Sequence, residues 1–170
     1  MTASAKSTAR VLLDTGFLVA LYDANDALHE ASRQWLWQSL GQFITADHVI
    51  TEACFFLATE DKAMLLDRIA DGWITVVPLG SQAYARIAAI LRKYANLKPD
   101  LTDACLVWLA ESTGVHGIFT VDVRDFSAYR IGGRSKFDLL PWQQALSAGP
   151  PTHHRAPNIS HVNPVGSSML

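Results

Sequence analysis

Short apolar runs that alternate with helical segments are the feature that most restricts how this chain can fold. RVLLD at residues 10–14 is suited to a buried strand, and the apolar positions that follow Thr15 recur at helical spacing. Strands that alternate with helices form a parallel sheet covered on both faces. The sequence therefore predicts an α/β fold, a three-layer α/β/α sandwich with a central parallel sheet. The further strands are expected at 43–45, 73–77, 117–120 and 137–140, and the further helices at 26–40, 47–58, 61–71, 81–94 and 102–112.

Length and composition favour one domain with two flexible ends. A chain of 170 residues that is 49% hydrophobic has enough apolar material for one sizeable core. From residue 147 the sequence changes, because this segment holds four of the seven prolines and shows no periodicity. We expect a flexible N-terminus at 1–9, a folded domain at 10–146 and a disordered C-terminal tail at 147–170.

Charge and targeting signals point to a cytoplasmic protein without a strong basic field. The formal net charge is -2 and the isoelectric point is near 6.3, so a polyanion would have to be bound by local patches or by metal ions. Neither a secretory signal nor a membrane span is predicted. The two cysteines, Cys54 and Cys105, fit no metal or redox spacing, and we interpret both as buried reduced thiols.

Four acidic residues are placed where an open parallel sheet binds ligands, beyond the carboxyl ends of its strands. Asp14 ends the first strand, and Glu52 lies in the helix that follows the second. Asp103 is in the first turn of a later helix, and Asp122 follows GIFT by two residues. Apolar residues flank Glu52 and Asp103, so these carboxylates are expected near the core.

Buried carboxylates that converge repel one another unless a cation is present. Mg or Mn would satisfy them, because these hard ions take oxygen ligands, and the resulting site could activate water for phosphodiester hydrolysis. Thr15, beside Asp14, could hydrogen-bond a ligand carboxylate or a metal-bound water.

Several acidic residues have a structural alternative. Asp14 could be the N-cap of the helix that follows it, and capping is the role preferred for Asp100 and for Asp47. Asp125 could be a fifth metal ligand or could organise a turn with Arg124, and the sequence leaves both open.

Basic residues near the acidic positions are the candidates for contact with a substrate phosphate. One run lies just downstream of Asp122, and a second group precedes Asp103; solvated surface is the alternative for both. The tryptophans at 35, 37, 73 and 108 are expected in the core. The first basic run is Arg124, Arg130, Arg134 and Lys136, and the second group is Arg92, Lys93 and Lys98.

The chain resembles the PIN-domain family, and within it the VapC-type toxin ribonucleases of toxin-antitoxin pairs, in the order of four segments: LLDTGFLVAL, TEACFFL, DLTDACLVWLAE and GIFTVDVRDFSAYR. The resemblance covers about residues 10–142. It implies a PIN-like α/β/α fold that binds Mg or Mn, an RNA substrate, a cognate antitoxin and a homodimer. The acidic quartet that it implies, as metal ligands and catalytic residues, is Asp14, Glu52, Asp103 and Asp122. Gly16 stands where many relatives have Ser or Asn, so one polar contact to the site is absent.

Other functions fit the sequence less well. The D-T-G triplet at residues 14–16 also occurs in aspartic proteases, but those need an all-β fold. A Mg-binding receiver-like signalling module would need a carboxylate at the end of its third strand, where this chain has Val76, Val77 and Pro78. A PIN nuclease of RNA processing keeps the fold and drops the toxin role.

The helices at 27–40 and 61–71 hold more apolar residues than one sheet face needs. We expect part of this surface to be buried against another chain in a homodimer; completion of the monomer core is the alternative. The residues concerned are Trp35, Leu36, Trp37, Met64, Leu65, Leu66 and Ile69.

Overall fold

A computed structural model describes residues 10–38 and 41–140 of the chain. Five strands alternate with seven α-helices and one 3₁₀ turn in this part of the chain. The strands are β1 (Arg10–Leu13), β2 (Gln42–Ala46), β3 (Ile74–Val77), β4 (Gly117–Phe119) and β5 (Asp138–Leu139). The helices are α1 (Thr15–Tyr22), α2 (His29–Gln38), α3 (Asp47–Phe56), α4 (Thr59–Ala70), α5 (Ser81–Lys93), η1 (Ala95–Leu97), α6 (Leu101–Thr113) and α7 (Val123–Ala128).

All strand pairs are parallel, and the sheet order is β3-β2-β1-β4-β5. Leu12 pairs with Ile44 on one side and with Ile118 on the other, so β1 is the central strand. The chain moves outward from β1 to β2 and β3, then crosses back to β4 and β5. The topological switch point therefore lies between the carboxyl ends of β1 and β4, which is where such sheets bind ligands.

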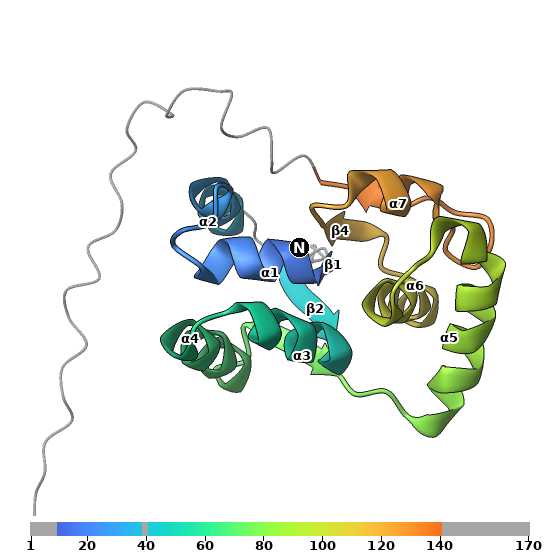
Figure 1. Ribbon diagram of the computed structural model, residues 1–170, viewed down its shortest axis with the longest axis horizontal. Helices are drawn as coiled ribbons and strands as arrows, with labels where there is room; N and C mark the ends of the chain where they lie inside the picture. The colour runs from blue at the N-terminus through green and yellow to red at the C-terminus, as the bar shows by residue number, and fades with distance from the viewer. Residues whose placement is uncertain (1–9, 39–40, 141–170) are drawn as a thin grey trace, which may run out of the picture.

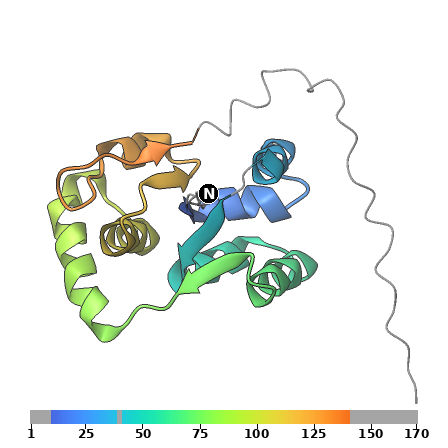
Figure 2. The same cartoon turned by 180° about the vertical axis from the view of Figure 1, so that it is seen from behind.

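Helices cover both faces of the sheet, which confirms the predicted three-layer α/β class. Helices α1 to α4 gather to one side of the strands, and α5 and α6 lie on the other side (Figures 1 and 2). Right-handed crossovers produce this arrangement when the chain reverses its direction across a sheet. The core between the layers is apolar and well packed: Phe17 of α1 stacks on Phe119 of β4 with ring centroids 4.6 Å apart, and both rings are fully buried.

Several predicted boundaries and roles were wrong. Helix α2 begins at His29 and not at Asp26, because the carboxylate of Asp26 accepts a hydrogen bond from the backbone N–H of Leu28 and holds the preceding residues in turns. Asp47 is not an N-cap: it is the first residue of α3, and Ala46 occupies the cap position. The short helix α7 was not predicted. Trp73 is exposed and lies against the guanidinium of Arg68, 5.5 Å from the ring centre.

The two cysteines are both free, as expected, but only Cys105 is buried. Burial raises the pKa of the Cys105 thiol to about 12, so this side chain stays protonated. Cys54 is half-buried. Three regions named in the sequence analysis lie outside the described residues: the expected flexible terminus at 1–9, the expected tail at 147–170 and the last residues of the expected domain. Within the described chain, none of the helices has the length and apolar character needed to cross a membrane.

Candidate active site

Asp14 is fixed at the switch point by the strands on either side. Its backbone N–H donates to the carbonyl of Phe119 at 3.0 Å, which extends the pairing of β1 with β4 by one residue. Its carboxylate accepts from the N–H of Thr15 at 2.7 Å and from the hydroxyl of Thr120 at 2.6 Å. Asp14 is thus both the N-cap of α1 and a buried carboxylate at the ligand-binding edge, so the two alternatives for this residue are compatible.

Glu52 is brought to the same edge by α3 and is oriented by two threonines. Its Oε2 accepts from the hydroxyl of Thr15 at 2.5 Å and from that of Thr102 at 2.8 Å. The Thr15 hydroxyl therefore links Glu52 to the start of α1, directly beside Asp14. Thr15 was predicted to hydrogen-bond a ligand carboxylate or a metal-bound water, and in the structure it donates to Glu52, whose role as a metal ligand stays a prediction.

Helix α6 presents Asp100 and Asp103 from its N-terminus. Asp100 is the N-cap and accepts from the N–H of Asp103 at 2.7 Å, as the sequence predicted. The Thr102 hydroxyl also lies 2.7 Å from Asp100, so its single hydrogen is shared between Asp100 and Glu52. Asp103 projects one turn into the helix, and its Oδ2 accepts from the buried Tyr129 hydroxyl at 2.9 Å.

Asp122 precedes α7, and Asp125 lies in its first turn. Asp122 is the N-cap and accepts from the N–H of Asp125 at 3.0 Å, while its own N–H donates to the Thr120 hydroxyl at 2.9 Å. Thr120 therefore joins Asp122 to Asp14 through two hydrogen bonds. Asp125 contributes a backbone donor to this turn, and whether its carboxylate binds a metal stays a prediction.

Burial, aided by neighbouring carboxylates, raises the pKa of two acidic residues at this edge. Burial raises the pKa of Asp14 to about 6, although its hydrogen bonds with Thr120 and Thr15 oppose this, and the charges of Asp100 and Glu52 add to it. Burial raises the pKa of Asp103 to about 7, helped by the charges of Asp100, Asp14 and Asp122 and opposed by the Tyr129 hydroxyl. Uncompensated negative charge is thus concentrated at the switch point.

The chemistry of these donors fits a hard divalent cation. They are carboxylate oxygens, which Mg and Mn prefer, and a cation would relieve the repulsion that raises the two pKa values. Among residues 10–38 and 41–140, however, no three Asp, Glu, His or Cys side chains are gathered closely enough to hold one ion as they stand. An ion would therefore have to draw the carboxylates closer together.

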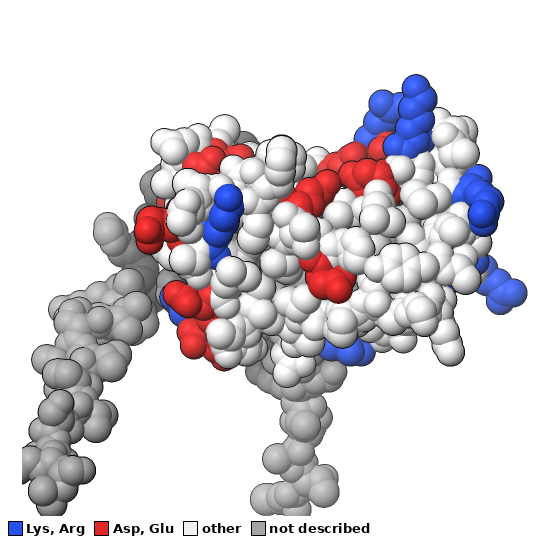
Figure 3. Space-filling view, turned by 60° about the horizontal axis from the view of Figure 1, so that its bottom comes forward, with Lys and Arg blue, Asp and Glu red and all other residues white. Residues whose placement is uncertain are grey.

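Basic side chains lie on the same side of the molecule as an acidic row. Figure 3 shows acidic side chains in a row across one face and Lys and Arg side chains beside one end of it. Arg124, Arg134 and Lys136 are exposed, as a residue that contacts RNA must be. Arg130 is half-buried, and its Nη1 donates to the carbonyls of Ser127, Ala128 and Tyr129 at the end of α7, so this guanidinium also stabilises a helix terminus.

Lys93 of the second basic group lies near the loop that carries part of the first basic run. A Cβ on Gly133 would lie 3.4 Å from the Nζ of Lys93, so the loop after α7 passes close to the end of α5. Arg92 and Lys98 are exposed in the same part of the chain. Their contact with RNA is still a prediction.

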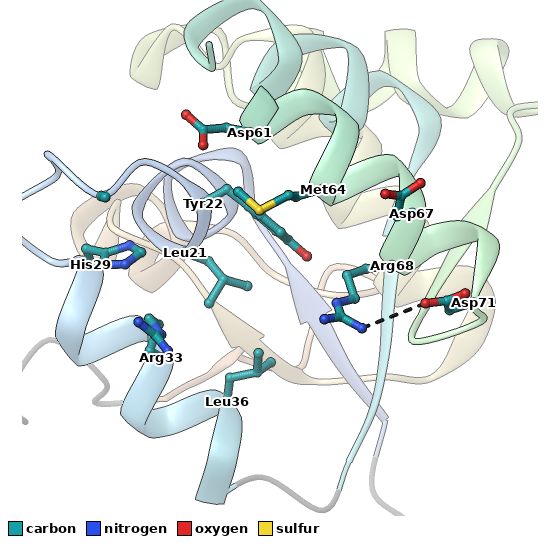
Figure 4. Close-up of a pocket in the computed structure, with 11 residues that line it drawn as sticks. Leu21, Tyr22, His29, Arg33, Leu36, Asp61, Met64, Asp67, Arg68 and Asp71 are labelled. Carbon is teal, nitrogen blue, oxygen red and sulfur yellow. Dashed lines mark ion pairs between the residues drawn. The ribbon is translucent and has the colours of Figure 1, made fainter. Parts of the chain in front are cut away.

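A separate hollow of about 600 Å³ lies between α2 and α4 (Figure 4). It is bordered by Leu21 and Tyr22, at the opposite end of α1 from Asp14. Arg68 and Asp71 form an ion pair at its rim, with Nη1 and Oδ2 3.7 Å apart. This hollow is therefore not part of the acidic edge.

Three contact residues of the site were not predicted: Thr102, Thr120 and Tyr129. The pattern T-x-D at 120–122 and the D-L-T-D run at 100–103 place threonines beside predicted ligands, and this was the available signal. The sequence carried no signal for Tyr129, because its contact with Asp103 joins residues 26 positions apart.

The fold and the site together define a doubly wound α/β protein with an acidic ligand-binding edge at the β1/β4 switch point. The chain belongs to the PIN domain family, whose model matches residues 11–132, and the resemblance seen in the sequence is thereby confirmed.

Two relatives from Mycobacterium tuberculosis are similar to this chain. Ribonuclease VapC26 is 27% identical over 135 residues, which cover 77% of this chain and all of that protein. The crystal structure of VapC20, described as a sarcin-ricin loop cleaving toxin, superimposes with a TM-score of 0.64 at 20% identity and covers 69% of this chain and 94% of that one. The similarity to the VapC20 structure supports the assignment of the fold alone.

Proposed function

We propose that this PIN-domain protein is a Mg- or Mn-dependent endoribonuclease that hydrolyses RNA phosphodiester bonds and acts as the toxin of a toxin-antitoxin pair. The observation that carries the proposal is the convergence of Asp14, Glu52 and Asp103 at the switch point, with the pKa values of Asp14 and Asp103 raised to about 6 and about 7. Family membership and the similarity to VapC26 support it.

The protein's part in the reaction is to hold charged oxygens in fixed positions. Thr15 N–H and Thr120 fix the Asp14 carboxylate, Thr15 and Thr102 fix that of Glu52, and Tyr129 fixes that of Asp103. Carboxylates that are already held in position need little rearrangement when the transition state forms, so little free energy is spent on orienting them. The cation would be held by the carboxylates of Asp14, Glu52, Asp103 and Asp122. Whether Asp125 is a fifth ligand is left open.

A bound divalent cation supplies two effects here: it lowers the pKa of an attacking water and it stabilises charge on the phosphoryl oxygens. Without positive charge, this acidic edge would repel the phosphates of RNA. The exposed Arg124, Arg134 and Lys136, together with Arg130, would bind phosphates farther along the strand.

The toxin role requires a partner. We propose a cognate antitoxin protein that blocks the acidic edge, a homodimeric toxin and a cytoplasmic location, where both RNA and an antitoxin are available. Copurification of the chain with the product of an adjacent small reading frame, and loss of cleavage in that complex, would be the expected results.

Metal dependence is the direct test of the proposed activity. The purified full-length chain is expected to cleave RNA with Mg or Mn, to stop when excess EDTA is added, and to resume when either ion is restored. The readout is the appearance of fragments from an end-labelled RNA. Cleavage that persists undiminished in excess EDTA would exclude the proposed mechanism.

Single carboxylate replacements separate metal ligands from caps. Four replacements are expected to lower the cleavage rate a hundredfold or more, which is about 2.7 kcal/mol in the activation free energy. They are Asp14→Asn, Glu52→Gln, Asp103→Asn and Asp122→Asn. Asp100→Asn is the matched control, because Asn also caps helices well and the change should alter activity little. An equal loss in Asp100→Asn would show that the cap and the ligand are assigned the wrong way round.

A further inference from the structure

A closed loop at residues 130–136, which we call the basic loop, follows α7. Its exposed part reads GGRSK, and the buried side chains of Ile131 and Phe137 lie on either side of that part. The N–H of Ile131 donates to the carbonyl of Ser135 at 2.8 Å and closes the turn. Figures 1 and 2 show the segment after α7 bending round to the end of α5. The loop is therefore held at both ends and presents its two cations to solvent.

Glu111 of α6 holds the basic loop by its backbone. Its Oε1 accepts from the N–H of Gly132 at 3.0 Å. The side chain of Glu111 is only 14% exposed, and Arg86 donates to both of its oxygens at 2.8 Å. Burial opposes ionisation of Glu111, but the hydrogen bonds and charge of Arg86, helped by Gly132 and Lys93, outweigh it and lower the pKa. Because Arg86 occupies both oxygens, Glu111 fixes the loop without pairing with the loop's cations.

A second contact fixes the start of the basic loop. The hydroxyl oxygen of Tyr94 accepts from the N–H of Arg130 at 2.9 Å. The ring of Tyr94 packs against that of Tyr129, whose hydroxyl donates to Asp103. The other neighbour of the Tyr94 ring is the Nζ of Lys93, 4.9 Å from the ring centre. The loop therefore begins one residue after a side chain that touches the acidic edge.

The cations of the basic loop lack carboxylate partners within the described part of the chain. Arg134 and Lys136 are exposed, and among the described residues neither forms an ion pair. Lys93 adds a third positive charge beside the loop, because its Nζ lies 3.4 Å from the place of a Cβ on Gly133. Positive charges gathered around a fixed backbone turn attract phosphate oxygens.

We propose that the basic loop is a preformed site for a backbone phosphate of the RNA away from the cleaved bond, and that Glu111 is the positioning residue that holds it ready. The proposal rests on the ribonuclease function above and adds a residue that acts on substrate affinity. Glu111 follows Asp103 by eight positions on α6, about 12 Å along the helix, so the phosphate bound there is not the scissile one. A loop that is ordered before binding loses less entropy when the phosphate binds.

The direction of the change in KM separates positioning from charge. Removal of a carboxylate makes the surface more positive, and by charge alone this would strengthen RNA binding. Release of the loop has the opposite effect. Glu111→Ala should therefore raise the KM for RNA roughly 5-fold to 30-fold, the effect of ordering the backbone of one residue on binding, and leave kcat little changed. Glu111→Gln removes the same charge but keeps an oxygen for the N–H of Gly132, so its KM should stay near the wild-type value.

The experiment measures KM and kcat of the full-length chain with Mg or Mn, on an end-labelled RNA that contains the mapped cleavage site, over a series of KCl concentrations. Arg134→Ala combined with Lys136→Ala should raise KM and lower the slope of log KM against log salt by about 2, one unit for each lost contact. Adding Glu111→Ala to this pair should change KM no further, because the loop then has no cation to position. Arg33→Ala combined with Lys62→Ala is the matched control, because it removes the same charge from α2 and α4 and should leave the slope unchanged.

Each outcome decides the proposal. A KM for Glu111→Ala at or below the wild-type value would overturn the positioning role, and so would full additivity with the loop pair. The loop pair alters exposed residues and decides the matter even if Glu111→Ala does not fold. Wild-type KM and salt slope in that pair, while Asp14→Asn is inactive, would overturn the phosphate site and leave the ribonuclease function standing. A wild-type chain that cleaves no RNA with Mg or Mn would overturn the function and this site together.

Discussion

Asp14 and Asp103 have raised pKa values because each is partly or wholly removed from water while its neighbours are also acidic. The hydrogen bonds from Thr15, Thr120 and Tyr129 reduce these shifts without abolishing them. Such carboxylates destabilise the folded chain when they are ionised, and they become favourable when a cation neutralises them. Stability and function therefore oppose each other at these positions.

The pH dependence of stability follows from the sign of the Asp14 shift. Its pKa rises from 3.8 in the unfolded chain to about 6 in the folded one, so between these values the folded state holds a proton that the unfolded state has lost. Stability should therefore fall as pH rises from about 4 to about 6 and stay low above that range. Asp14→Asn is expected to raise the Tm by several degrees at pH 7.5 in EDTA and by much less at pH 4.5.

The measurement is thermal unfolding by circular dichroism at both pH values. Asp67→Asn, at an exposed position on α4, is the control and should show no such pH-dependent gain. Adding Mg or Mn should raise the Tm of the wild-type chain and leave that of Asp14→Asn nearly unchanged. A variant that is less stable than wild type at both pH values would contradict the assigned shift.

Tyr129 positions Asp103, and its hydroxyl can be tested alone. Tyr129→Phe removes the hydrogen bond to Oδ2 of Asp103, which favours the ionised form, so the pKa of Asp103 should rise further above about 7. The acidic limb of the pH–activity profile should move to higher pH, with a stability loss of about 1 kcal/mol. Tyr94→Phe removes a hydroxyl from the adjacent ring, whose centroid is 5.1 Å away, and should leave the profile in place.

At the scale of the elements, the strands and long helices were predictable because their apolar patterns reflect burial. β1, β2 and β4 contribute side chains that are almost wholly buried, and each appears in the sequence as a short apolar run. Helix α7 was missed because six residues are too few for a helical period to show. The sequence predicts Asp122 as a ligand and leaves Asp125 open between a fifth ligand and a turn residue, whereas in the structure Asp122 is also the N-cap of α7.

The side-chain contacts of the site could not be predicted, because they join elements far apart in the chain. Thr120 reaches Asp14 across 106 positions, and Thr102 reaches Glu52 across 50. The sequence places acidic residues after strands and thereby indicates which edge they share. The partner of each carboxylate depends on the order of the strands, which periodicity does not specify.

Gly16 determines how closely α1 approaches the segment between β4 and α7. A Cβ at this position would collide with Cγ2 of Val121 and would lie 3.2 Å from its Cβ. Gly16→Ser should therefore displace Val121 and the adjacent Asp122, with a stability loss of about 1–3 kcal/mol and lower activity. The glycine is explained by packing and not only by a missing polar contact.

A double-mutant cycle checks this pair. Val121→Ala removes the methyl groups nearest to Gly16, so the combination with Gly16→Ser should recover part of the lost stability in urea unfolding. Simple additivity of the two changes would show that the collision is relieved elsewhere.

For the molecule as a whole, the expected homodimer depends on α2 and α4. Leu65 is fully buried and belongs to the monomer core, while Met64 and Leu66 are about half exposed. Trp35, Leu36 and Ile69 are partly buried against the core, and the side chain of Trp37 lies outside the description. The apolar excess predicted from the sequence is therefore divided between the core and individual exposed side chains on α4.

Light scattering tests the homodimer. At tens of micromolar we expect the mass of two chains, because exposed apolar side chains of α4 such as Met64 and Leu66 would be buried in the pair. Met64→Glu combined with Leu66→Glu should yield a single chain, whereas Tyr84→Glu, at an exposed position on α5, should not change the mass. A wild-type mass of one chain that does not change on dilution would exclude the dimer.

The strand order also determines when the acidic edge can come into existence during synthesis. Asp14 is translated early and Asp122 follows 108 positions later, which takes roughly 5 to 20 seconds at about 5–20 residues per second. Until β4 has left the ribosome and paired with β1, the N–H of Asp14 lacks the Phe119 carbonyl and its carboxylate lacks the Thr120 hydroxyl. A nascent chain is thus unable to assemble the edge until nearly the whole folded domain has been synthesised.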